Sequence, residues 1–168
     1  MSDSGGRASR LMVVGIGNPD RGDDGFGALV VKQLEGRLTP DVALLARAGD
    51  LMSLIEEWAG IDALVCVDAT APMGSPGRVF RLDVSVDEIP RDLASTSSHG
   101  LGLPEAVALA RTLGTAPGRV IVYAVEAAGF EIGAPMTPAV AAAAGAVADL
   151  VAGEVRRLSE NIAPALVA

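Results

Sequence analysis

Short apolar runs alternate along the chain with segments in which apolar side chains recur at helical spacing. The apolar runs predict five strands, at 10–16, 42–46, 63–67, 78–83 and 118–124. The helical spacing predicts helices over 26–38, 51–58 and 104–113, and a long alanine-rich helix over 137–159. This alternation favours an α/β fold, a three-layer αβα sandwich around a five-stranded, mostly parallel sheet. The run at 78–83 follows its predecessor through a short loop, so we expect it to be an antiparallel edge strand.

The length of 168 residues fits one domain with a sizeable core. We expect a single domain over 10–160, with a disordered Ser- and Gly-rich tail over 1–9 and a C-terminal tail over 161–168. Asp50 precedes the second helical segment, where its carboxylate is suited to capping the free amides of the first turn.

Composition narrows the possible partners and the compartment. The formal net charge of −8 disfavours nucleic acid and anionic membranes as partners. No apolar run approaches the ~20 residues of a membrane span, so we expect no membrane segment. Cys66 is the only cysteine and lies in an apolar run, which indicates a buried thiol in a reducing compartment. These features together predict a cytoplasmic protein.

Acidic residues lie where the predicted strands end. Asp23 and Asp24 follow the first strand, Asp68 follows the third, and Glu126 follows the last. Because the carboxyl ends of parallel strands meet at one edge of a sheet, we expect these carboxylates to lie near one another.

The only histidine, His99, lies in the loop-like sequence SSHGLG before the helix that leads into the last strand. Together with Asp24 and Asp68 it forms an O/O/N donor set suited to a divalent transition metal. The residues alone leave simpler roles open, in which Asp24 caps the first helix, Asp68 is a turn residue and His99 bonds locally.

Two other motifs are disfavoured. Gly15 and Gly17 resemble the start of a dinucleotide-binding fingerprint, but Asp20 stands where its third glycine belongs, and acids would repel a pyrophosphate there. A Ser-His-Asp triad could use only His99 as its base, and the chain contains no G-x-S-x-G sequence.

Three segments, GIGNPDRGDDGFG, VCVDA and SSHGLGL, resemble in order and spacing the hydrogenase maturation endopeptidases, the nickel-dependent peptidases of [NiFe] hydrogenases. The similarity extends over roughly 11–158, and YAVEAAGFEIGAPMTPAV resembles the family's last strand, loop and helix. The resemblance implies a five-stranded mixed sheet with an antiparallel fourth strand. It places the metal-contacting residues at Asp24, Asp68 and His99, and makes Asp24 and Asp68 the catalytic candidates.

The resemblance also implies an aspartic-type endopeptidase that acts on the precursor of a hydrogenase large subunit. It would remove the C-terminal extension after nickel insertion, recognising nickel that the substrate itself delivers. We therefore expect the isolated protein, a monomer, to bind nickel weakly or not at all. Either the metal or a carboxylate could activate water. Segments 84–98 and 127–136 are candidates for holding the large subunit, or are ordinary solvated loops.

The chain departs from the family pattern at one place. Many members have an acid followed by Gly-Gly-Thr after the second strand, whereas this chain has Arg47-Ala48-Gly49-Asp50. Whether Asp50 takes over that role is open, as is the identity of the hydrogenase. Two other functions remain to be separated from the peptidase, a non-catalytic nickel checkpoint or assembly factor and a general metallohydrolase.

Overall fold

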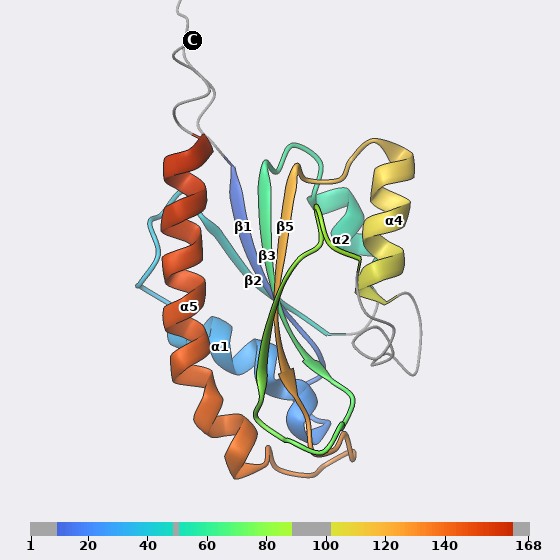
Figure 1. Ribbon diagram of the computed structural model, residues 1–168, viewed down its shortest axis with the longest axis vertical. Coiled ribbons are helices and arrows are strands. Elements are labelled where there is room, and N and C mark those ends of the chain that lie inside the picture. Colours follow the sequence, from blue (N-terminus) through green and yellow to red (C-terminus); the bar gives the residue numbers. More distant parts are fainter. Residues whose placement is uncertain (1–9, 49–50, 89–101, 163–168) are drawn as a thin grey trace, which may run out of the picture.

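The computed structural model describes residues 10–48, 51–88 and 102–162, which form one mixed sheet flanked by helices (Figure 1). The strand order is β2-β1-β3-β5-β4, and β4 alone pairs antiparallel, with β5. The predicted antiparallel edge strand is therefore confirmed. The strands are β1 (Leu11–Ile16), β2 (Ala43–Arg47), β3 (Ala63–Thr70), β4 (Val79–Asp83) and β5 (Arg119–Glu126).

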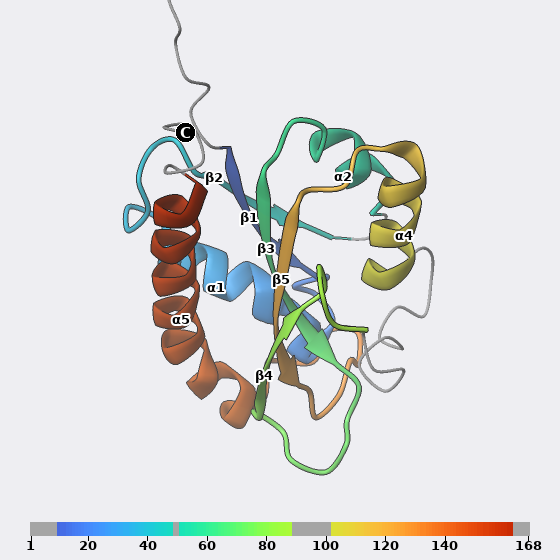
Figure 2. The same ribbon diagram turned by 45° about the horizontal axis from the view of Figure 1, so that its top comes forward.

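Helices cover both faces of the sheet, which confirms the three-layer αβα sandwich (Figure 2). On one face lie α1 (Phe26–Leu34) and α5 (Pro138–Ile162), and on the other lie α2 (Met52–Glu57) and α4 (Leu103–Leu113). A 3-10 turn, η1 (Gly22–Gly25), connects the end of β1 to α1.

The central strand β3 divides the core between the two helical layers. Val65, Val67 and Ala69 pack toward α1 and α5, whereas Leu64 and Cys66 pack toward α2 and α4. This two-residue alternation, with nearly every position buried, is typical of a parallel strand covered on both faces.

Several element ends differ from the predicted ones. Helix α1 ends at Leu34 instead of residue 38, because the backbone turns out of the helix at Glu35 and Gly36 takes a left-handed conformation, φ 73°. Strands β3 and β5 each run further than predicted, to Thr70 and Glu126. Asp50 lies outside the described residues, so its predicted capping role stays a prediction.

Helix α5 is, within the described ranges, the one helix long and apolar enough to cross a membrane, with a mean hydropathy of 1.4. The expectation that no segment approaches the length and hydropathy of a membrane span is therefore not met by α5. Its apolar stripe, from Val140 through Val147 to Leu158, is buried against the sheet, which accounts for the hydropathy as that of a core helix.

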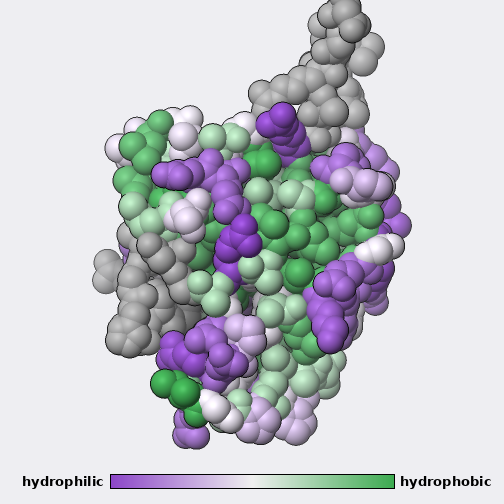
Figure 3. All heavy atoms as spheres, turned by 180° about the vertical axis from the view of Figure 1, so that it is seen from behind, coloured by the Kyte–Doolittle hydropathy of each residue, from purple (hydrophilic) through white to green (hydrophobic). Residues whose placement is uncertain are grey.

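The face opposite to that of Figure 1 combines a broad apolar area with groups of polar side chains around it (Figure 3).

Candidate active site

The site begins where β1 ends and β3 continues. Strand β1 pairs with β3 only as far as Gly15 opposite Val67, whereas β5 stays paired with β3 through Thr70. The turn η1 contacts β3, in the place that a longer β1 would occupy. Asp68 therefore lies within β3, not after it as predicted, and it is the first residue of β3 without a partner on β1.

Glycines allow η1 and α1 to approach the strands closely. A Cβ on Gly27 would lie 2.6 Å from the backbone nitrogen of Ile16 and 2.7 Å from the carbonyl oxygen of Val67. A Cβ on Gly17, whose φ is 129°, would lie 2.0 Å from the carbonyl oxygen of Asp24. Only glycine fits these positions, so the glycines of the GIGNPDRGDDGFG segment bring Asp24 against the end of the sheet.

Asp24 is half-buried, and its Oδ2 accepts a hydrogen bond from the backbone N–H of Asn18 at 2.8 Å. The first residue before α1 is Gly25, and no side chain caps that helix. The simpler alternative, in which Asp24 caps the helix, is therefore wrong. Its carboxylate instead stabilises the turn that follows β1, through the hydrogen bond from Asn18.

Asp68 lies on the same face of β3 as Cys66 and is partly buried. Burial, with a smaller contribution from the charge of Asp24, raises its pKa to about 8, although the N–H of Ala69 donates a hydrogen bond to Oδ1 at 2.8 Å that acts in the opposite direction. The charge of Asp24 thus acts on the carboxyl group of Asp68, which places the two acidic side chains in the same part of the fold. Cys66 is inert by comparison, because burial, followed by the charge of Asp68, raises the pKa of its thiol.

Asp23 has a different role from its neighbour. Its side chain is fully buried and accepts hydrogen bonds from the backbone N–H groups of Ala128 at 2.7 Å, Gly129 at 3.3 Å and Thr137 at 2.7 Å. The hydroxyl of Thr137 donates as well, at 2.9 Å. Burial alone would raise the pKa of Asp23, but these donors outweigh it and lower the pKa. Asp23 is thus a charged anchor for both ends of the β5–α5 loop, residues 127–137.

Glu126 is likewise structural. Its side chain is 1% exposed, and Oε1 accepts hydrogen bonds from the N–H groups of Met73 at 2.7 Å and Ser75 at 2.6 Å. It therefore holds the β3–β4 loop, and of the four acids that the sequence placed at this edge, Asp24 and Asp68 form the candidate site.

The third predicted ligand, His99, lies outside the described residues, so its position stays a prediction. Within the described ranges no cluster of three metal-ligating side chains occurs. Asp50 is outside them too, whereas the nearby Arg47 binds both carboxylate oxygens of Glu57, at 3.0 and 3.1 Å. Asp24 and Asp68 offer oxygen donors that fit a divalent metal with open positions.

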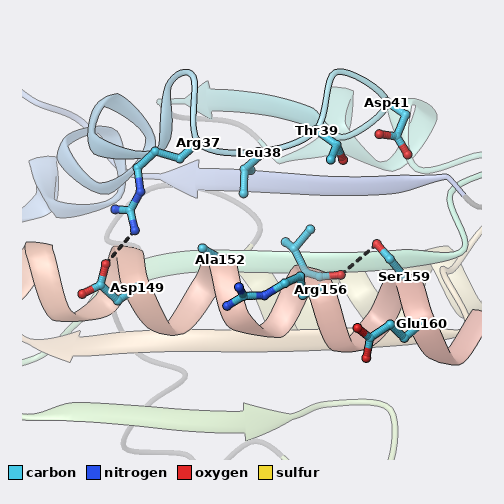
Figure 4. A pocket seen from close by; sticks show the side chains of 10 residues that line it. Arg37, Leu38, Thr39, Asp41, Asp149, Ala152, Arg156, Ser159 and Glu160 are labelled. Carbon is cyan, nitrogen blue, oxygen red and sulfur yellow. Dashed lines mark hydrogen bonds and ion pairs between the residues drawn. The ribbon is translucent and has the colours of Figure 1, made fainter.

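Away from Asp24 and Asp68, a cavity of about 710 Å³ lies between the α1–β2 connection and the second half of α5 (Figure 4). Charges of both signs line it, and Arg37 and Asp149 form an ion pair there at 2.6 Å. Neither Asp24 nor Asp68 contributes to it.

Several known proteins resemble this chain in sequence or in fold. The HupD hydrogenase expression/formation protein of Bradyrhizobium diazoefficiens is 31% identical over 137 residues, which are 79% of this chain and 70% of that protein. HupD of Thiocapsa roseopersicina is 33% identical over 120 residues, 69% of this chain, and the match spans 53% of that relative's length. The hydrogenase maturating endopeptidase HybD from Escherichia coli has the same fold, with a TM-score of 0.72 at 24% identity over 88% of this chain and 93% of that one.

The sequence pattern of the hydrogenase maturation protease family HycI matches residues 29–154, about three quarters of the chain. The mixed sheet with one antiparallel edge pair is the one that the resemblance implied. On this evidence the chain belongs to the family of hydrogenase maturation proteases.

Proposed function

We propose that this protein is the endopeptidase that removes the C-terminal extension from a [NiFe] hydrogenase large-subunit precursor once nickel is in place. Membership of the protease family supports this proposal. The single structural observation that carries it is that Asp68, the first residue of β3 beyond the end of its pairing with β1, lies within the electrostatic influence of Asp24 in η1. Nickel belongs to the substrate in this proposal, and it reaches the two carboxylates with the precursor.

Asp24 and Asp68 have different roles in this proposal. The carboxylate of Asp24 is held in place by Asn18 and faces the substrate metal as an oxygen ligand. Asp68, whose pKa is about 8, exchanges its proton near neutral pH and is suited to move a proton during hydrolysis. Water adds to the scissile carbonyl, the C–N bond breaks, and the new amine leaves with a proton. His99 completes the proposed donor set toward nickel.

The proposed setting is the cytoplasm, with the protein acting as a monomer. The net charge of −8 and the single buried thiol of Cys66 support this setting, because neither favours a membrane surface or an oxidising compartment.

The decisive experiment mixes the purified protein with nickel-loaded and nickel-free precursor and follows the large subunit by mass spectrometry. We expect loss of the C-terminal extension from the loaded precursor alone. Binding of loaded precursor without any cleavage would identify a nickel checkpoint instead. Tight, stoichiometric zinc that survives dialysis against a chelator would indicate a general metallohydrolase.

Variants connect the activity to the site. Asp24→Asn should abolish cleavage, because the amide keeps the shape of the side chain and removes the charge that attracts a cation. Asp41→Asn is the matched control. Asp41 is exposed and precedes the amino end of β2, at the end of the parallel strands opposite to Asp24 and Asp68, so cleavage should be unchanged. Equal activity of the Asp24→Asn variant and the wild type would remove Asp24 from the mechanism.

A further inference from the structure

The β5–α5 loop forms a wall of a small pocket against η1, the turn that carries Asp24. Asp23 binds Ala128 and Thr137 at the two ends of the loop, and the N–H of Gly133, near its middle, donates to the carbonyl oxygen of Asp20 at 2.7 Å. Three separate points therefore attach this loop to the segment that carries Asp24. A loop held in this way is a preformed surface, not one that must be ordered when a ligand binds.

The pocket has a cavity volume of about 210 Å³. This is below the roughly 300–1,000 Å³ of sites that take whole small molecules, and it suits one side chain of a larger ligand. Its lining is small and largely apolar, and consists of Gly22, Ala128, Gly129, Glu131, Ala134, Pro135 and Thr137.

The polar groups near the pocket leave its interior with little hydrogen-bonding capacity. The hydroxyl of Thr137 donates to Asp23, and Asp23 is itself completely buried. Glu131 carries the one charge of the lining and is exposed, so that charge stays in water. At the tip of the loop Ile132 is 85% exposed, an apolar side chain available to a protein that lies across this edge.

We propose that this pocket is the subsite for one compact apolar side chain of the precursor, in the residues that flank the bond to be cut. The inference rests on the proposed function and deepens it. Gly22 lies in the pocket lining and is only two residues from Asp24, so a peptide held by one side chain here passes close to the two carboxylates. The cavity has room for one apolar side chain and not for a longer segment of the peptide.

The test fills the pocket with Ala134→Leu. Ala134 and Gly22 both line the pocket, and the Cβ of Ala134 lies 3.8 Å from the position that a Cβ on Gly22 would take, so a longer side chain at residue 134 takes up part of the cavity. We expect at least a tenfold loss of kcat/KM on nickel-loaded precursor and a matching rise in the Kd for that precursor, with an unchanged melting temperature. Ala146→Leu, at an exposed alanine of α5, is the matched control and should leave each value unchanged.

Rescue separates a subsite from general damage to the loop. Each of the three precursor residues on either side of the scissile bond is shortened to glycine in turn. One of these precursors should restore at least part of the lost activity and affinity with Ala134→Leu, and should be bound less well than the native precursor by the wild type. Wild-type values for Ala134→Leu, or a loss that no shortened precursor restores, would overturn the subsite. If the wild-type protein binds precursor without cutting it, the proposed function fails and the Kd measurements still decide the subsite. If it does neither, both proposals fail.

Discussion

A Cβ built on Gly15 would lie 2.2 Å from the carbonyl oxygen of Gly27, so the backbones of β1 and α1 are in direct contact. No residue with a Cβ atom fits at position 15. This contact fixes where α1 begins relative to the sheet, and hence where the preceding turn η1 holds Asp24 beside Asp68.

Gly27→Ala should therefore lower both stability and activity. The new methyl group would meet backbone atoms of β1 and β3, which have no room to move. We expect a loss of about 1–3 kcal/mol in the free energy of unfolding, measured by chemical denaturation, and slower precursor cleavage by the folded fraction.

Gly145→Ala is the contrasting substitution. Gly145 is exposed in the interior of α5, and a Cβ there would approach only the side chain of Gln33, at 3.8 Å. Alanine favours a helix over glycine, so this variant should gain about 0.5–1 kcal/mol with unchanged cleavage. A comparable loss in the two variants would show that the contact with β1 has no special role.

Asp68→Asn should lose cleavage and gain stability. The folded state raises the pKa of Asp68 from 3.8 to about 8, so the folded protein holds a proton that the unfolded chain releases. Wild-type stability therefore falls as the pH rises from about 4 to 8, and the amide variant lacks this loss. Thermal melting of both proteins across this range should show a difference that grows with pH. A constant difference would show that the pKa of Asp68 is not raised in the folded protein.

Glu154→Gln should destabilise the packing of α5 on the sheet. The buried carboxylate of Glu154 binds Arg81 through two hydrogen bonds, of 2.9 and 3.0 Å, and accepts others from Tyr123 at 2.6 Å and Arg157 at 2.9 Å. The loss should be about 3 kcal/mol, at the lower end for a buried pair, because Arg81 is partly exposed to water. Tyr123→Phe removes one hydrogen bond and should cost less, about 1–2 kcal/mol.

The carboxylate of Glu154 should also make the stability of the protein depend on pH under acidic conditions. Its hydrogen bonds to Arg81, above all, lower the pKa of Glu154 from 4.5 to about 2. The stabilisation it provides is therefore complete above about pH 4.5 and is lost as the pH falls toward 2. Denaturation curves of the wild type and Glu154→Gln should converge over this interval. Parallel curves down to pH 2 would contradict this account.

His99→Ala and His99→Gln should abolish cleavage of loaded precursor and leave the melting temperature unchanged. A metal-binding imidazole must be neutral, so wild-type activity should fall as the pH drops below the range in which a histidine side chain ordinarily loses its proton, about 6.5. Lower melting temperatures with cleavage retained would instead assign His99 a structural role.

The periodicity of the sequence was sufficient to predict the layers, because β1, β3 and β5 are buried on both faces and leave apolar runs in the sequence. The short loop before β4 predicted its antiparallel direction. The periodicity could not separate Asp23 from Asp24. Both are aspartates in one turn, and only the arrival of Ala128 and Thr137 from a distant loop makes Asp23 an internal anchor. The end of β3 was missed for a similar reason, because an acid at position 68 indicates a loop until pairing with β5 is known.

The hydrogen bonds between Asp23 and Thr137 join residues 114 positions apart in the chain. Contacts of such long sequence separation are costly in chain entropy to close, and folds that depend on them fold slowly. The β5–α5 loop, which forms one wall of the pocket beside η1, is thus fixed in place only when Thr137, directly before α5, binds Asp23. A nascent or truncated chain that ends before Thr137 would carry both Asp24 and Asp68 and still lack a finished site, which would link proteolytic activity to the completion of synthesis.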